Sequence, residues 1–142
     1  MRRRVAIVGY AQSHHQDNVQ KTREDMVFEV CDTALRHASM RRDDLDTVVT
    51  ASTDFLDGRT ISSVFLSMAV GAFMKDESKV EEDGTFAFHY ALMRVLAGVH
   101  DVAMVEAHTQ SSTMNVHQVS CWTLDPQFDR PVGVLNDIAA AA

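Results

Sequence analysis

The sequence predicts an α/β fold in which a mixed, largely parallel β-sheet is covered by helices. Short apolar runs rich in β-branched residues alternate along the chain with longer segments of helical apolar spacing. That alternation is typical of right-handed β-α-β units. The 142 residues, of which 46% are apolar, suffice for one domain with a core of its own. We therefore expect a single domain over residues 1–142, with an irregular extension over residues 108–142.

The first half of the chain predicts two strands and one helix. Residues 4–9, RVAIVG, are a short apolar run that ends in glycine and indicate a buried first strand. Thr22 and Asp25 have the spacing of a capping box, which predicts a helix start. Residues 46–52 indicate a second strand. The apolar stripe of the helix is formed by Met26, Val27, Val30, Cys31, Ala34 and Leu35.

The second half predicts two helices and two strands. A helix capped near Thr60 is followed by a short strand at residues 79–82 and by a helix from 85 to 97. Gly98 is expected just past the end of that last helix, with a left-handed backbone. Residues 101–107 indicate another buried strand. The stripe of the helix after Thr60 would be Ile61, Val64, Phe65, Met68, Ala69 and Ala72.

Composition excludes several classes of protein. No apolar run approaches the ~20 residues that span a bilayer. The basic and apolar start, MRRRVAIVGYAQ, is too short for a secretion signal and has no small-residue cleavage site after it. The net charge of −7 argues against a nucleic-acid surface. We expect a cytoplasmic protein that binds neither nucleic acid nor membrane.

The cysteines and histidines do not predict a disulfide or a metal site. Two cysteines, Cys31 and Cys121, cannot build a disulfide framework, and Cys31 is expected to pack in the core rather than react. The seven histidines have no HExxH or HxxxH spacing, and no CxxC accompanies them. We therefore expect no metal and no cofactor.

The turn after the strand at 79–82 draws attention, because strand-to-helix turns of α/β enzymes often carry a nucleophile. Here the turn offers Asp83, Gly84 and Thr85, with neither Cys nor Ser. Thr85 is a weak candidate nucleophile and a stronger candidate helix cap. His89, one turn further on, is either an acid or base or an exposed helical histidine. The acidic residues Glu81, Glu82 and Asp83 either stabilise the helix start or supply a base.

A second group of candidates follows the last predicted strand. Glu106 interrupts that strand and His108 ends it, with Ser111 and Ser112 close behind. Ligands of open α/β sheets gather at the carboxyl ends of the strands. His108 is therefore a weak catalytic candidate. Ser111 and Ser112, together with Gly84 in the earlier turn, are candidate substrate-binding residues.

Four stretches, in this order, resemble the first half of a thiolase: VAIVGYAQS, EDMVFEVCDTALRHASMRRDDLDTVVTAS, KVEEDGTFAFHYALMRVLAG and HDVAMVEAHTQSS. The likeness is closest to the acetyl-CoA acetyltransferase and sterol-carrier-type branch and covers nearly the whole chain. It implies a thiolase-like half fold and acyl-CoA as substrate, with coenzyme A part of that substrate. It also implies an acyltransferase of lipid metabolism.

The resemblance also carries two departures. Thiolases place a cysteine at the helix start that corresponds to Gly84, where a helix N-terminus lowers a thiol pKa. This sequence has no cysteine within 35 residues of Gly84. Thiolases are also built from two such halves, and the second supplies further catalytic residues. The chain is therefore expected to be a fragment, or one subunit completed by a partner, and to be inactive alone.

Three functional hypotheses remain open at this point. The first is a subunit or fragment that binds acyl-CoA within an enzyme that makes or cleaves C–C bonds, by acyl transfer or by lyase chemistry. The second is a non-catalytic interaction subunit of a thiolase-like complex. The third is an unrelated nucleotide-binding domain suggested by Gly9, which lacks a GxGxxG pattern around it. We expect a homo- or hetero-oligomer, with residues 79–82 at an interface as the resemblance implies.

Overall fold

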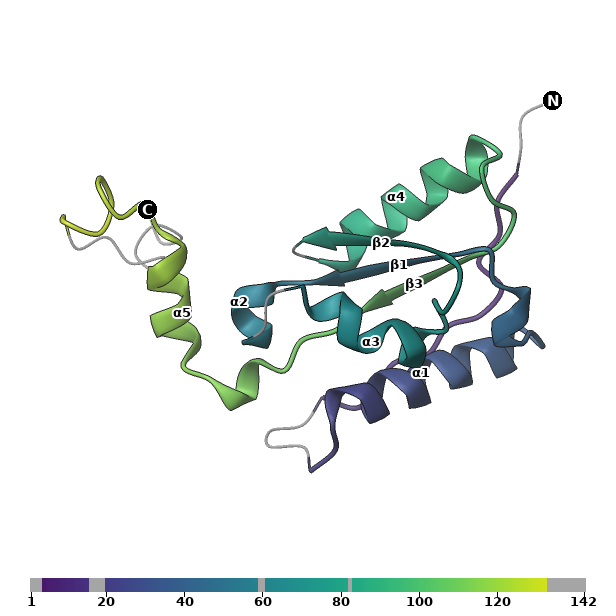
Figure 1. The fold of residues 1–142 in the computed structure, drawn as a ribbon, viewed down its shortest axis with the longest axis horizontal. Helices are drawn as coiled ribbons and strands as arrows, with labels where there is room; N and C mark the ends of the chain where they lie inside the picture. Colours follow the sequence, from purple (N-terminus) through teal and green to yellow (C-terminus); the bar gives the residue numbers. More distant parts are fainter. Residues whose placement is uncertain (1–3, 16–19, 59–60, 82, 133–142) are drawn as a thin grey trace.

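The chain folds as an α/β domain around a small parallel sheet (Figure 1). The structure is a computed structural model and describes residues 4–15, 20–58, 61–81 and 83–132. The strands are β1 (Thr47–Ser52), β2 (Asp76–Glu81) and β3 (Ala103–Ala107), in the order β2-β1-β3. Both strand pairs are parallel. The predicted α/β class is confirmed, but the described strands are all parallel, whereas the sequence predicted a mixed sheet.

Helix α1 (Arg23–His37) begins where its capping residues predict. The Thr22 hydroxyl accepts a hydrogen bond from the Asp25 backbone N–H at 3.1 Å and donates one to the Asp25 carboxylate at 2.7 Å. These bonds satisfy an N–H group that the helix itself leaves unpaired. Three members of the predicted stripe are buried: Val27, Cys31 and Leu35.

The alternation of side chains along β1 divides the core into two layers. Val48 packs against α1 and against α3 (Ser62–Val70) on one face of the sheet. Val49 and Ala51 pack against α4 (Gly84–Leu96) on the other face. Every β1 residue is buried, as expected for a central strand covered on both sides.

The predicted first strand is absent. Residues 4–9 form no ladder with any strand among the described residues. The chain packs on α1 instead. An added Cβ at Gly9 would lie 2.3 Å from the Ala34 carbonyl oxygen, and His37 Nδ1 lies 2.8 Å from the Tyr10 carbonyl oxygen. Its apolar residues remain largely exposed, with Ile7 at 75%.

The stripe predicted for the second helix is correct only in part: Ala69 and Ala72 are buried, whereas the other four residues are exposed. Thr60 lies outside the described residues, and α3 begins at Ser62. Its buried side chains are Ser63, Leu66, Ala69 and Val70, whereas Val64, Phe65 and Met68 are exposed. The helix carries apolar residues almost all the way round, so their spacing does not select one face.

Two helices arise where the sequence suggests irregular chain. The short α2 (Asp54–Asp57) follows β1 directly, and Gly58 ends it at φ +65°. Helix α5 (Val116–Thr123) lies within the predicted irregular extension, behind a short 3₁₀ turn at Ser111–Thr113. Asn115 caps α5 by accepting a hydrogen bond from the Gln118 backbone N–H at 3.1 Å. A second 3₁₀ turn, Arg42–Asp44, precedes β1.

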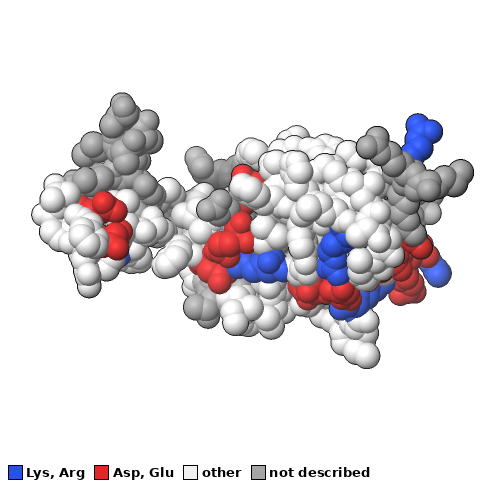
Figure 2. All heavy atoms as spheres, turned by 90° about the horizontal axis from the view of Figure 1, so that it is seen from above, with Lys and Arg blue, Asp and Glu red and all other residues white. Residues whose placement is uncertain are grey.

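The outer face of α4 is apolar and exposed. Figure 2 shows a broad surface with few charged side chains on that side of the molecule. Phe86, Met93 and Leu96 are 55%, 58% and 46% exposed. None of the helices in the described part of the chain combines the length and hydropathy that a membrane-spanning segment needs.

Candidate functional site

The carboxyl ends of the three parallel strands meet at one edge of the sheet, where α1 and α4 also begin (Figure 1). A groove of about 1350 Å³ passes this edge. Its walls come from residues 4–15, α1, β3 and α4. In parallel α/β sheets this edge is where ligands bind, so its side chains are the place to look for chemistry.

His108 is the centre of a buried polar cluster at this edge. Its Nε2 lies 3.0 Å from Asp57 Oδ2, and its Nδ1 lies 3.1 Å from both carboxylate oxygens of Glu106. Glu106 and His108 are two residues apart on extended chain, so both project to the α1 side of the sheet. Their side chains are each 6% exposed, and that of Asp57 is fully buried.

Arg23 brings a positive charge to the same cluster from the first turn of α1. Its Nη2 donates a hydrogen bond to the Asp57 backbone oxygen at 3.0 Å and lies 3.4 Å from the Gln110 side-chain oxygen. Its Nη1 lies 3.7 Å from Asp57 Oδ1. The Arg23 side chain is 10% exposed. Because buried charges are costly unless paired, this arginine compensates part of the negative charge of the two carboxylates.

The geometry around His108 fixes how many protons the cluster holds. A neutral imidazole has one N–H donor and one acceptor nitrogen. Here both nitrogens face carboxylate oxygens, which accept when ionised. The two contacts are both hydrogen bonds only when the ring carries two protons or when one carboxyl is protonated. The distances among Asp57, Glu106 and His108 are therefore short enough for a proton to be shared between the ring and a carboxyl group.

The cluster also has hydrogen-bonding capacity to spare. Among the described residues, Arg23 Nε, Asp57 Oδ1 and Thr50 Oγ1 are buried side-chain atoms without a hydrogen-bond partner. Thr50 is paired in register with Glu106 across β1 and β3. Unsatisfied buried polar groups are rare in native proteins and call for a water or a ligand group. Of these residues Arg23 lines the groove, so its Nε is the unpaired donor that a polar ligand atom there would meet.

The turn into α4 lies on the opposite face of the same edge. Asp83 caps the helix by accepting hydrogen bonds from the Thr85 and Phe86 backbone N–H groups, at 2.7 and 3.2 Å. A Cβ added at Gly84 would lie 2.9 Å from the Ala107 Cβ. Glycine at 84 therefore lets the helix N-terminus approach the end of β3 closely. Both Asp83 and Gly84 line the groove.

The structure separates the residues predicted for the site. His108, Gly84 and Ser111 line the groove, and Ser112 is exposed outside its lining. His89 is exposed on α4, where its Nδ1 lies 2.9 Å from the Thr85 carbonyl oxygen. Thr85 is not the helix cap, because Asp83 takes that role. Glu82 lies outside the described residues.

A second ionic cluster joins the ends of β1 and β2. Lys79 pairs with the Asp54 carboxylate and, at 3.1 Å, with that of Glu81. Glu81 also accepts a hydrogen bond from the Asp54 backbone N–H at 3.0 Å. Burial lowers the pKa of Lys79, but its hydrogen bonds to the two carboxylates outweigh that effect and raise it. Glu81 therefore ties α2 to the sheet, and a charged lysine is part of that link.

Two members of the buried cluster were not predicted. Asp57 stands five residues after the end of the second strand, at the edge where ligands gather, and that position was a usable signal. No sequence signal pointed to Arg23 except the capping residues beside it. Its role depends on the packing of the domain, which places the start of α1 at the sheet edge where β3 ends.

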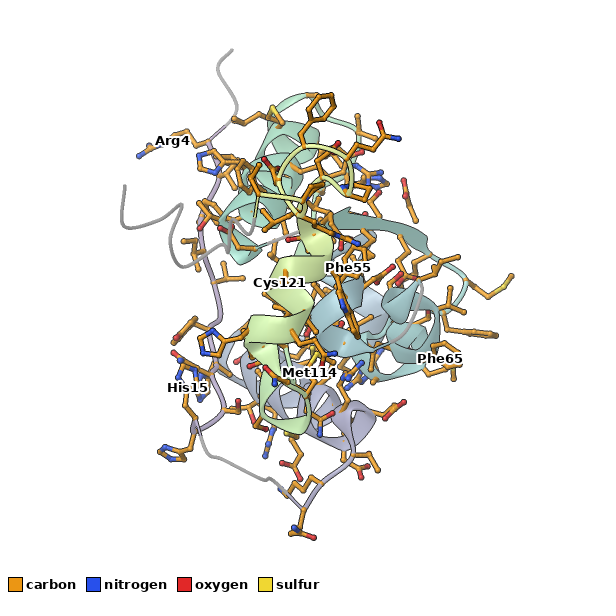
Figure 3. The ribbon with its side chains drawn as sticks, turned by 90° about the vertical axis from the view of Figure 1, so that its left-hand side faces the viewer. Arg4, His15, Phe55, Phe65, Met114 and Cys121 are labelled. Carbon is orange, nitrogen blue, oxygen red and sulfur yellow. The ribbon has the colours of Figure 1, made fainter. Side chains whose placement is uncertain are left out.

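The two cysteines are free thiols, and the described residues offer no metal site. Among the described residues, no group of three His, Cys, Asp or Glu side chains has the geometry to hold a metal ion. Cys31 is a buried free thiol, and burial together with the nearby Glu106 charge raises its pKa to about 12. Cys121 is a half-buried free thiol on α5 (Figure 3). The predicted core position of Cys31 is confirmed.

Comparison with known proteins does not assign the chain to a family. No protein-family model matches the chain, and no curated protein is significantly similar to it.

Proposed function

We propose that this chain is an acyl-CoA-binding subunit or segment of an enzyme that makes or cleaves C–C bonds in acyl-CoA thioesters. The observation that carries the proposal is the buried cluster of Asp57, Glu106 and His108, set against a groove at the carboxyl edge of a parallel sheet. The order of thiolase-like stretches supports the same substrate class, as does the close approach of Gly84 to β3.

The chemistry proposed for this site is proton transfer. In cleavage of a 3-hydroxyacyl thioester, a base takes the hydroxyl proton, the Cα–Cβ bond breaks and a carbonyl compound leaves. The electron pair of that bond forms a thioester enolate, which an acid then protonates. His108 is the candidate for acid or base, because its ring shares a proton with two carboxylates. Such a reaction needs no cysteine nucleophile, which fits the absence of one near Gly84.

The turn at Gly84 has a separate role in this proposal. A helix begins there with backbone N–H groups not used within the helix, and the helix dipole favours negative charge. Asp83 already takes two of these groups. The remaining N–H groups at this helix start, beside the groove that Asp83 and Gly84 line, would be the donors for a thioester oxygen.

Acyl-CoA binding is tested by isothermal titration calorimetry with acetyl-CoA and octanoyl-CoA, on the chain alone and with any subunit that co-purifies with it. We expect binding, and we expect His108→Gln to abolish turnover of a 3-hydroxyacyl-CoA by the complete assembly. His89→Gln is the matched control, because that histidine is exposed on α4, away from the cluster. Absence of heat with every acyl-CoA in the complete assembly would refute the proposal.

A second candidate function is a non-catalytic interaction subunit. The exposed apolar face of α4, with Phe86, Tyr90 and Met93, favours it (Figure 2). Unchanged turnover of the complete assembly after His108→Gln, His89→Gln and Thr85→Ala would support this role. A large loss of turnover in a His108→Gln variant that circular dichroism shows to be folded, in an assembly that stays intact, would exclude it.

A further inference from the structure

The outer edge of β3 is unpaired. In the strand order β2-β1-β3, β3 has a neighbour on one side only. The Thr47 N–H donates to the Val102 oxygen, and the His108 N–H donates to the Ala51 oxygen at 3.1 Å. Backbone groups alternate in direction along a strand, so residues 102, 104, 106 and 108 face β1. The backbone N–H and C=O groups of residues 103, 105 and 107 face outward, and no described residue pairs with them.

A groove separates this edge from the N-terminal chain. Residues 4–13 and residues 101–109 line the same groove from two sides. Figure 3 shows the chain between Arg4 and His15 passing along one side of the molecule, from the level of α4 to that of α1. The contacts of Gly9 and Tyr10 with α1 hold this chain in place. The N-terminal chain therefore stands off from β3 instead of pairing with it.

The walls of the groove are apolar above and below the sheet along most of β3, and charged at its carboxyl end, where Arg23, Glu106 and Asp83 line it. On the α1 side they include Val27, Val30 and Cys31, and on the α4 side Ala91, Leu92 and Val95. An extended segment laid along β3 would point alternate side chains to these two walls. It must therefore be apolar on both faces and at least as long as β3, which has five residues. The volume of about 1350 Å³ exceeds the roughly 300–1,000 Å³ of small-molecule pockets.

We propose that the groove beside β3 binds a β-strand of a partner polypeptide, which extends the sheet at this edge. The strand is uncharged and rich in β-branched residues, and its backbone pairs with Ala103, Val105 and Ala107. This mode of recognition draws affinity from main-chain hydrogen bonds and specificity from the alternating side chains. It depends on the geometry of β3. The strand would lie in the same groove as the proposed acyl-CoA site, so the two ligands would compete for it.

A second copy of this chain does not fit the groove as well. Strand β2, DESKVE, is mostly charged and polar, so it cannot face two apolar walls. Strand β3 carries Glu106 within the buried cluster. The extended residues 4–9 are apolar but are held on their own α1. Among the described residues, this leaves no free apolar strand that a second copy could insert.

The probe for the test is the capped heptapeptide KVVAVVK, added to the intact chain and followed by calorimetry and amide hydrogen exchange. We expect saturable one-to-one binding, and slower exchange at the amides of Ala103, Val105 and Ala107. A version of the peptide methylated on alternate backbone nitrogens should bind at least about tenfold more weakly, because it cannot complete the ladder. This peptide control does not depend on the folding of any variant.

Val105→Pro is the matching change on the protein. Proline removes the outward N–H and is tolerated on edge strands at such positions. We expect this variant to lose at least about tenfold in peptide affinity, whereas Val105→Ala, which keeps the N–H, stays within about threefold. Equal binding of plain and methylated peptide, or no binding at all, would overturn the proposal. So would a dimer by light scattering that Val105→Pro dissociates, because a second copy would then occupy the edge.

Discussion

His108 and Asp57 are in contact at 3.0 Å although 51 residues separate them in the sequence. The contact joins the end of β3 to α2, and both side chains are withdrawn from solvent. Because the pair is buried, the stability of the fold depends on both partners: removing one can leave the other as an uncompensated charge. The same contact therefore serves the proposed proton transfer and the stability of this edge of the sheet.

We predict that His108→Gln lowers the free energy of unfolding by about 3–5 kcal/mol, because it leaves the buried carboxyl groups of Asp57 and Glu106 without their shared imidazole partner. Urea unfolding measures the change. His89→Gln, at an exposed position of α4, should stay within about 0.5 kcal/mol of the wild type. Equal stabilities of the two variants would show that the cluster does not contribute to folding.

The close approach of Gly84 to β3 gives the next prediction. Gly84→Ala places a Cβ 2.9 Å from the Ala107 Cβ, a separation at which the helix or the strand must shift. Overpacking of this kind costs about 1–3 kcal/mol. The double variant Gly84→Ala with Ala107→Gly removes the clash and should recover most of the loss in urea unfolding. A double variant less stable than the sum of the two single changes would contradict the packing argument.

The sequence predicted well those elements whose signals are local. Helix α1 begins at the predicted cap Thr22, and three residues of its predicted stripe are buried. Gly98 was expected to be left-handed just past a helix end, and its φ of +78° confirms this. Strands β1 and β3 were recognised from their β-branched runs, within two residues of their observed bounds.

The predictions that were wrong concern features that depend on tertiary contacts. Residues 4–9 have the composition of a strand, yet a strand needs a partner, and the chain here is held on α1 by Gly9 and Tyr10. The face of α3 could not be chosen because apolar residues surround the helix. The site was predicted in part for the same reason. His108 follows from the end of a strand, whereas Arg23 joins it only through the packing of α1.

The identity of the α4 cap can be tested directly. Asp83→Ala removes the carboxylate that accepts from two backbone N–H groups, and should cost about 0.5–2 kcal/mol. Thr85→Ala should change stability by less than about 0.5 kcal/mol, because the Thr85 side chain is exposed and does not cap the helix. Thermal or urea unfolding distinguishes the two. A larger effect at Thr85 would restore the assignment expected from sequence.

Asp76 gives a prediction for the dependence of stability on pH. Hydrogen bonds from Arg94, and then from His100 at 3.0 Å, hold the pKa of Asp76 below its ordinary value of 3.8. A carboxyl with a depressed pKa stabilises the fold above its unfolded pKa, and the contribution is lost as the pH falls through the folded pKa. The stability difference between wild type and Asp76→Asn should therefore be constant above about pH 5 and shrink below pH 3.8.

Urea unfolding between pH 3 and pH 7 measures this difference. Because the Asp76 side chain is 45% exposed, added salt should reduce it. Asp43→Asn, at an exposed position before β1, is the control and should show no such loss of stability difference on acidification. A difference between wild type and Asp76→Asn that grows toward low pH would contradict the assigned ion pair.

The two free cysteines should differ sharply in reactivity. Cys31 is 2% exposed, and burial is the main cause that raises the pKa of its thiol from 9.0 to about 12. Three pKa units correspond to about a thousandfold smaller thiolate fraction at pH 8, and the thiolate is the reactive form. Iodoacetamide followed by peptide mass spectrometry should therefore modify Cys121, on α5, well before Cys31.

A Cys121→Ser variant isolates the buried thiol. In the native variant we expect almost no alkylation at pH 8, and rapid alkylation once urea unfolds the chain, because α1 must leave the sheet to expose Cys31. The rate of modification against urea concentration should follow the unfolding curve measured by circular dichroism. Alkylation of Cys31 in the native variant at the rate of an unfolded thiol would mean that α1 does not cover this face of the sheet in solution. The walls proposed for the strand-binding groove would then need revision, because Cys31 is one of them.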